Sequence, residues 1–363
     1  MREKLAHIHV VVMIYMVEAG LVLFRFPQLE AEHFGTNGWV SLLICFAAAS
    51  LNILLLLPVH KMAKGRSIFN IMEHSAPKFL LFPFYLAIAG VWGMTASLAS
   101  KEYVHILKMV SFPTVAPTTF VTAIGVLAFY LYSKGIYNIA KAAMIFFLLS
   151  FWMAFLLFYF LGEFQFARMT PFLFQESNDM LIGFMNIYPS YLGYELVLLM
   201  IPYADGKTKL VRAAFQGTFF AALLYLYVGI ICFGLFSLQQ LKMVPFPVLD
   251  LLADIRFPFM ERIENLFYGF FLFSNIVTTT VYYWAASQFG RRIAPGWNGK
   301  LVGALLIAIC AGVSLVPNTL MKTEAWVQTV GYAGICVAIG LPIVVIGFLL
   351  LQKRKGGPLH DQK

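Results

Sequence analysis

Two glutamates lie inside long apolar stretches of this 363-residue chain, each close to a glycine. Glu18 stands two residues before Gly20, and Glu195 stands two residues after Gly193. A carboxylate in the hydrocarbon of a membrane costs about 3 kcal/mol even on lenient insertion scales, so such groups face a protein interior or a water-filled path. We therefore interpret the two glutamates as site residues or as structural residues with a buried partner.

The glycines suggest what chemistry these positions could perform. Glycine lets a backbone leave helical geometry cheaply, and a break frees N–H and C=O groups that hydrocarbon cannot satisfy. The half-helix after a break presents N–H groups to an anion, and the half-helix before it ends in carbonyls suited to a cation. A free amino acid fits both, although kinked helices with buried glutamates are the alternative. The candidate ligand-binding residues at the two breaks are Glu18, Ala19, Gly20, Tyr191, Gly193, Tyr194 and Glu195.

The composition indicates that these sites lie in a membrane protein. The chain is 61% hydrophobic and only 12% charged, which is typical of a protein made mostly of membrane spans and excludes a soluble core. Apolar windows long enough to cross about 30 Å of hydrocarbon predict ten helices. They cover residues 8–27, 39–59, 79–106, 115–132, 139–162, 183–203, 211–236, 259–289, 301–317 and 326–351.

The basic residues predict the orientation of these helices. Lys and Arg gather in the tails and in every second connection, whereas acidic residues gather in the others, so both termini are expected to be cytoplasmic. The net charge of +9 is therefore a topology signal and does not indicate nucleic-acid binding. The four cysteines lie in apolar runs without a Cys-x-x-Cys pair, so no disulfide framework or metal site is expected. No catalytic or nucleotide-binding motif is present, and neither an enzyme nor a cofactor is predicted.

The two breaks also form an internal repeat. Leu-Val-Leu occurs at 21–23 and at 196–198, and a proline follows it at Pro27 and Pro202. Since each half contains five helices, an odd number, the second half must cross the membrane in the opposite direction. This is the pattern of an inverted-repeat transporter with broken first and sixth helices. The predicted organisation is a five-helix repeat at 1–162, an outer connection at 163–182, a second repeat at 183–351 and a basic tail at 352–363. A short amphipathic helix near 245–257 is expected at the outer membrane interface.

Polar residues in the third and eighth spans are further candidates. Ser274, Asn275, Thr278 and Thr279 could coordinate Na⁺ or line the cavity, or could simply mediate helix packing. Trp92, in the middle of the third span, is a candidate for ligand contact beside glycines that permit close packing.

Charged residues near the outer ends of the spans suggest gates or ion pairs. Glu261, Arg262 and Glu264 are expected to form a structural ion pair or an outer gate. Arg25 is expected to snorkel to the outer interface; pairing with Glu30 or Glu32, or a place in an outer gate, are the alternatives.

Several motifs resemble those of the spore germination permease family. They are the segment 192–195 leading to 202–203 and a basic loop, the Glu-Arg-x-Glu run at 261–264, the Val-Thr-Thr-Thr run at 277–280 and the Gly-Trp pair at 38–39. The family comprises the B subunits of GerA-type germinant receptors, within the amino acid/polyamine/organocation superfamily.

The resemblance implies a ten-helix inverted-repeat protein in the inner membrane of a dormant endospore. Such a subunit would bind a small germinant, such as an amino acid, and act with an A subunit and a C lipoprotein. Glu18 stands where the family has the first glycine of a Gly-x-Gly pair, which favours a neutral, cationic or sugar-like germinant or an inorganic cation. The rival functions are an autonomous amino acid transporter coupled to H⁺ or Na⁺, and a scaffold or ion-conducting subunit that binds no germinant.

Overall fold

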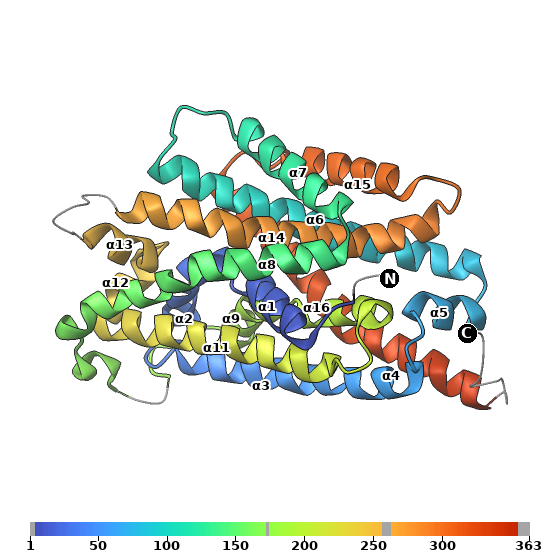
Figure 1. Ribbon diagram of the computed structural model, residues 1–363. Coiled ribbons are helices and arrows are strands. Elements are labelled where there is room, and N and C mark those ends of the chain that lie inside the picture. The colour runs from blue at the N-terminus through green and yellow to red at the C-terminus, as the bar shows by residue number, and fades with distance from the viewer. Residues whose placement is uncertain (1–3, 172–173, 256–262, 355–363) are drawn as a thin grey trace.

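The protein is a bundle of helices that run mostly along one long axis (Figure 1). The computed structural model describes residues 4–171, 174–255 and 263–354. Within this part of the chain, five helical stretches are long and apolar enough to cross a membrane: Val40–Ala63, Lys78–Val110, Ile136–Glu163, Leu210–Leu235 and Leu320–Arg354. Shorter apolar helices accompany them, so the structure is all-helical, and the count of ten spans stays a prediction.

The first half of the chain begins with an interrupted helix and continues with long ones. Its elements are α1 (His7–Glu18), η1 (Leu21–Phe24), α2 (Phe26–Phe34), α3 (Val40–Leu54), α4 (Leu56–Ala63), α5 (Ile68–Ser75), α6 (Lys78–Val110), α7 (Pro117–Ser133), α8 (Ile136–Ser150), and the 3₁₀ segments η2 (Phe151–Glu163) and η3 (Phe166–Met169).

The second half begins in the same way, with a helix broken into short pieces. Its elements are α9 (Met180–Ile187), η4 (Tyr188–Tyr191), η5 (Tyr194–Leu196), α10 (Val197–Met200), η6 (Ile201–Tyr203), α11 (Leu210–Leu235), α12 (Leu238–Met243), α13 (Pro247–Asp254), α14 (Ile263–Ile293), α15 (Gly299–Ser314) and α16 (Leu320–Arg354).

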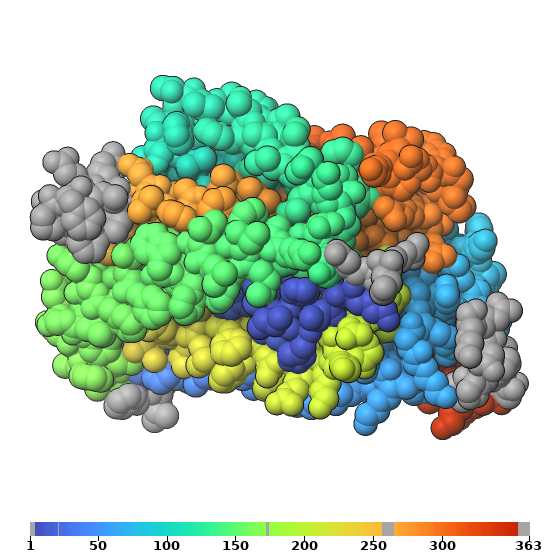
Figure 2. All heavy atoms as spheres, viewed as in Figure 1, coloured from blue at the N-terminus to red at the C-terminus, as the bar shows by residue number. Residues whose placement is uncertain are grey.

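The arrangement places the interrupted helices at the centre. α6 and α14 pack against each other along their lengths, α7 and α15 lie together at one edge, and α3 packs on α11 at the opposite edge (Figure 1). α1 contacts α8, α11 and α14. On the face seen in the space-filling view, its first turns reach the surface in a gap between α8 and α11 (Figure 2). The breaks are therefore held inside a scaffold of continuous helices.

Two predicted features fall at the margins of this scaffold. The segment expected to form an amphipathic helix contains α13, whose apolar residues Val248, Leu249, Leu251 and Leu252 are buried while Asp250 and Asp254 are exposed. Its position at a membrane surface stays a prediction. Glu261 and Arg262 lie outside the described residues, and Glu264 lies in the first turn of α14 with a side chain outside the described part.

Candidate functional site

At the first break, carbonyl groups at the end of α1 contact α14. α1 stops at Glu18, and the backbone passes through Ala19 and an extended Gly20 before η1 begins. The Ser274 hydroxyl donates to the carbonyls of Met16 at 3.1 Å and Ala19 at 3.0 Å. These bonds satisfy carbonyls that the end of a helix leaves without an intrahelical partner.

Thr278 completes this cluster one turn further along α14. Its hydroxyl lies 3.1 Å from the carbonyl of Met16 and 3.4 Å from that of Val17. Two of the residues predicted to bind a cation or line the cavity therefore contact the freed carbonyls of the first break. Asn275, between them in sequence, donates its amide instead to the carbonyl of Ala99 on α6 at 3.1 Å.

The second break is sharper, and a side chain of the break itself accepts a hydrogen bond from the freed backbone. Leu192 is extended and Gly193 has φ +143°, a backbone conformation that side-chain-bearing residues rarely adopt. The Gly193 N–H donates to Oε2 of Glu195 at 2.7 Å. The sequence had suggested that free N–H groups at a break could bind a ligand anion. At Gly193 the Glu195 carboxylate already accepts the hydrogen bond from that N–H.

The two breaks touch each other. A Cβ at Gly193 would lie 2.9 Å from Cγ1 of Val17 and 3.3 Å from Cγ of Glu18. α11 joins them further, because the Tyr225 hydroxyl lies at the carbonyls of both Glu18 and Ser190. The two breaks therefore meet inside the bundle.

A cavity of about 120 Å³ lies beside this contact. Four candidate residues line it, namely Glu18, Gly20, Asn275 and Thr278. The rest of its wall is formed by Val17, Val22, Thr95, Leu98, Ala99, Glu102, Pro189, Ser190, Leu192, Phe271, Val327, Val330, Gly331 and Gly334. The wall is mostly apolar, with acidic and amide groups at a few points, which is the usual character of a small-molecule site.

The remaining candidate residues lie around the cavity without lining it. Ala19 and Ser274 line a neighbouring cavity of about 60 Å³. The Tyr194 hydroxyl lies 2.8 Å from that of Tyr188 and 2.7 Å from the Asn52 amide, and the Tyr191 hydroxyl donates to the Leu42 carbonyl at 3.0 Å. Trp92 packs edge-on against Phe289, and the Thr279 hydroxyl lies 2.7 Å from that of Ser100. The tyrosine contacts join the second break to α3, and those of Trp92 and Thr279 join α6 to α14.

Sequence reasoning missed Glu102, which lines the cavity from α6. The signal was visible, since Glu102 is an acidic residue inside the third apolar window. Its neighbour Lys101 is buried but points elsewhere: its ammonium donates to the carbonyls of Ser314, at 2.5 Å, and Pro317 at the end of α15. Lys101 therefore does not neutralise Glu102 through a direct contact.

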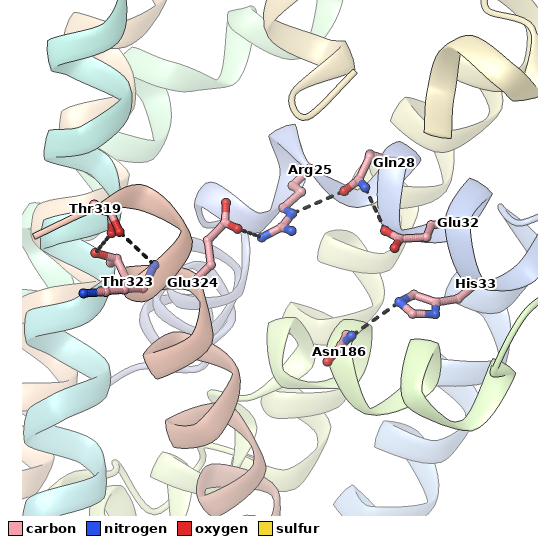
Figure 3. Close-up of polar contacts among 9 residues, drawn as sticks. Arg25, Gln28, Glu32, His33, Asn186, Thr319, Thr323 and Glu324 are labelled. Atoms are coloured by element: carbon pink, nitrogen blue, oxygen red, sulfur yellow. Dashed lines mark hydrogen bonds and ion pairs between the residues drawn. The ribbon is translucent and has the colours of Figure 1, made fainter. Parts of the chain in front are cut away.

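An ion pair lies one turn outside the cavity. Arg25 Nη1 lies 2.8 Å from Glu324 Oε2, which joins the end of η1 to α16 (Figure 3). Arg25 lies three positions after Val22, and Glu324 lies three positions before Val327; Val22 and Val327 both line the cavity. The sequence favoured snorkelling of Arg25, with a pair with Glu30 or Glu32 or a place in an outer gate as alternatives; the ion-pair partner in the structure is Glu324. Arg25 also donates to Gln28, which in turn donates to Glu32.

At the other end, backbone pairing ties the start of the chain to the end of the second broken helix. The Leu5 N–H donates to the Tyr203 carbonyl at 2.9 Å, and the Asp205 N–H donates to the Leu5 carbonyl at 3.1 Å. The first broken region is thus tied to α16 near one of its ends and to the end of the second broken helix near the other.

Comparison with known proteins decides the family. Residues 4–325 match the family described as spore germination protein. The chain belongs to this family. It is 21% identical over 344 residues to spore germination protein GerQB of Bacillus cereus, covering 92% of each chain. It is 23% identical over 383 residues to spore germination protein B2 of Bacillus subtilis (strain 168), covering 98% of this chain and 97% of that one. The family is one of germination permeases, not of enzymes.

Solved transporter structures share the fold. MhsT, crystallised with L-phenylalanine, superposes with a TM-score of 0.65 at 12% identity, covering 97% of this chain and 99% of that one. Mhp1, a nucleobase-cation-symport-1 family transporter in a closed conformation, superposes with a TM-score of 0.61 at 11% identity, covering 99% and 95%. The spore germination protein therefore has a LeuT-like transporter fold.

Proposed function

We propose that this protein is the germinant-sensing membrane subunit of a spore germinant receptor, binding a small polar solute in the cavity between the two breaks. The observation that supports this most directly is the cavity itself. It lies where the broken helices meet, and a carboxylate and an amide with unsatisfied oxygens line it.

The contacts on either side of the cavity provide a way for binding to become a signal. The Arg25–Glu324 pair connects η1 to α16, and the Leu5 backbone pairs with the end of η6. A solute that fits only when one of these contacts is formed, or only when it is broken, would shift the population between two access states. Differential affinity for the two states is what drives such a shift.

Family membership supports the remaining parts of the proposal. The subunit would act in the inner membrane of the spore together with a receptor A subunit and a C lipoprotein, with both termini on the spore-core side. The alternation of basic residues along the chain supports that orientation.

A second candidate function is an autonomous transporter coupled to Na⁺ or H⁺. The oxygen cluster at the first break favours this function. Hard cations are coordinated by oxygen atoms, and the cluster contains the carbonyls of Met16 and Ala19 and the hydroxyls of Ser274 and Thr278. Uptake of a solute into proteoliposomes driven by a Na⁺ or H⁺ gradient would favour the transporter over the sensor.

The test of the sensor function is to fill the cavity. Ala99→Leu places a larger side chain at the cavity wall while leaving the backbone carbonyl that accepts from Asn275. We expect spores with this variant to need at least about tenfold more germinant, which corresponds to about 1.4 kcal/mol of lost binding. Germination is followed as the loss of spore refractility, and the amount of protein in the spore membrane is measured in parallel.

Ala47→Leu is the matched control, because Ala47 is exposed on the outside of α3. It should germinate like the wild type. Normal germination of Ala99→Leu spores that hold a normal amount of the protein would count against the proposed site.

A further inference from the structure

We infer that the ligand of this cavity carries an organic ammonium group on a small apolar body and has no carboxylate that must be bound. This ligand class depends on the proposed function, since it assigns the chemistry of the same cavity. The inference comes from the unsatisfied hydrogen-bonding groups in the wall and from the apolar surface around them.

The cavity wall holds buried acceptors that lack donors. Glu18 is 2% exposed; its Oε1 accepts from Thr218 at 2.8 Å, and its Oε2 has no partner in the described part of the chain. Asn275 is 3% exposed, and its Oδ1 likewise has no partner among the described residues. Glu102, which is 8% exposed, adds a second acidic side chain to the wall. An unsatisfied buried acceptor costs about 1–3 kcal/mol, so a ligand that brings N–H donors would bind favourably here.

The side chains of the wall, as far as the structure describes them, offer no matching donor to an anion. The lining hydroxyls already donate to backbone carbonyls: Thr95 to Val91, Ser190 to Ile187, and Thr278 to Met16. Among the described residues that line the cavity there is no lysine, arginine or histidine.

The nearest groups that could bind a carboxylate are also engaged. Arg25 pairs with Glu324, and the Lys101 ammonium donates to carbonyls of α15 and the loop after it. At the second break the Gly193 N–H is taken by the Glu195 carboxylate. A ligand carboxylate would therefore meet the acidic side chains of Glu18 and Glu102 and no free side-chain donor among the described residues of the wall.

The rest of the wall decides between an organic and an inorganic cation. Val22, Leu98, Phe271, Val327 and Val330 surround the acceptors. Apolar surface favours an apolar partner at about 25 cal/mol per Å² removed from water, so an alkyl group attached to the ammonium would gain what a bare ion would not. An ammonium with three donors can also reach more than one of the unsatisfied oxygens.

The experiment uses the full-length protein in nanodiscs, three organic probes of matched size and different charge, and one inorganic cation. Isothermal titration calorimetry compares n-butylamine, n-butanol, sodium butyrate and potassium chloride at constant ionic strength. We expect n-butylamine to bind, and its Kd to rise at least about tenfold in Glu18→Gln and in Glu102→Gln, as expected when a charge-assisted hydrogen bond is replaced by a neutral one. Glu32→Gln, an exposed acidic position outside the cavity, is the control and should leave the Kd unchanged.

Several results would overturn the inference. Binding of butyrate or butanol that is as strong as that of the amine would do so, and so would binding of potassium alone. An amine Kd that is the same in all variants would place the amine elsewhere, and absence of amine binding would also reject this ligand class. If Ala99→Leu still raises the germinant requirement in these cases, the site stands and only its ligand class is wrong; if it does not, the proposed function fails as well.

Discussion

The two helix breaks contain the same residue types and use them in opposite ways. At the first, Glu18 ends α1 and keeps one oxygen without a partner in the cavity wall. At the second, Glu195 lies just after the break and bonds the Gly193 N–H. The first break is open to a ligand, and the second is closed by its own side chain.

The order of glutamate and glycine explains this difference. Glu195 lies in the first turn of the segment that follows its break, where free N–H groups and the positive end of the helix dipole stabilise a carboxylate. Glu18 lies in the last turn of the helix before its break, where the free groups are carbonyls and the dipole is unfavourable for a negative charge. Swapping two residues therefore turns one break into a structural joint and leaves the other suited to a cation.

The largest expected effect comes from a methyl group at each glycine. Gly193→Ala would force a side chain into φ +143° and within 2.9 Å of Val17, whereas a Cβ at Gly20 meets nothing closer than 3.6 Å. We expect Gly193→Ala to destabilise the protein by about 3 kcal/mol through backbone strain and overpacking. Thermal unfolding of the purified variants in nanodiscs measures the difference.

Gly20→Ala is the control for this experiment, and it should unfold within about 0.5 kcal/mol of the wild type because its backbone φ of −97° is ordinary. Equal melting of the two alanine variants would show that the breaks do not differ in the way their geometry indicates.

Removal of the two carboxylates should have the next largest effect. Glu195→Ala leaves the buried Gly193 N–H without an acceptor, which costs about 2 kcal/mol. Glu195→Gln should recover most of this loss, since its amide oxygen can accept the same bond. Glu18→Ala should cost less, about 1 kcal/mol, because it removes one hydrogen bond from Thr218 together with an unsatisfied oxygen.

Hydrogen–deuterium exchange of the segment 188–203 is the measurement that separates these cases. Faster exchange there in Glu195→Ala, with protection restored in Glu195→Gln and little changed in Glu18→Ala, is the expected pattern. Equal acceleration by both alanine variants would mean that the Glu195 bond does not hold the second break.

The breaks themselves were predictable from the sequence, because a glutamate and a glycine in an apolar window have few structural explanations. The order of Glu18 and Gly20 relative to Glu195 and Gly193 was also visible, and capping physics converts that order into the roles seen here. What the sequence could not show is which distant residues complete each break. Thr218 and Ser274 lie about 200 residues or more from α1 in sequence, and only packing brings their hydroxyls to it.

The fold was predictable to a similar depth. Apolar windows located the helices, yet the windows at 8–27 and 183–203 could not reveal how each broken helix divides into α-helical and 3₁₀ segments. The partner of Arg25 was not predictable either, since sequence proximity favoured Glu30 or Glu32 and the fold supplied Glu324. Glu30 is instead fully buried, and neither of its carboxylate oxygens has a partner in the described part of the chain.

The smallest expected effect concerns the ion pair, which joins only the first break to another helix. Arg25 and Glu324 are both about one-fifth exposed or less, and a pair of this kind contributes about 1 kcal/mol or less. Arg25→Ala and Glu324→Ala should each loosen the outer side of the cavity. A cysteine at Val330 on the cavity wall should then react up to about fivefold faster with a membrane-impermeant thiol reagent, the factor that corresponds to 1 kcal/mol. The background carries Cys336→Ser, because Cys336 is the exposed cysteine among the described residues.

Exchanging the two charges decides whether the pair or either residue alone matters. Arg25→Glu combined with Glu324→Arg should restore slow labelling, because the attraction is kept while both side chains are changed. If labelling in the exchanged protein is as fast as in the single variants, the contact between η1 and α16 does not control access. The first break would then be open to ligands through its own backbone alone, and the difference between the two breaks would lie entirely in the placement of their glutamates.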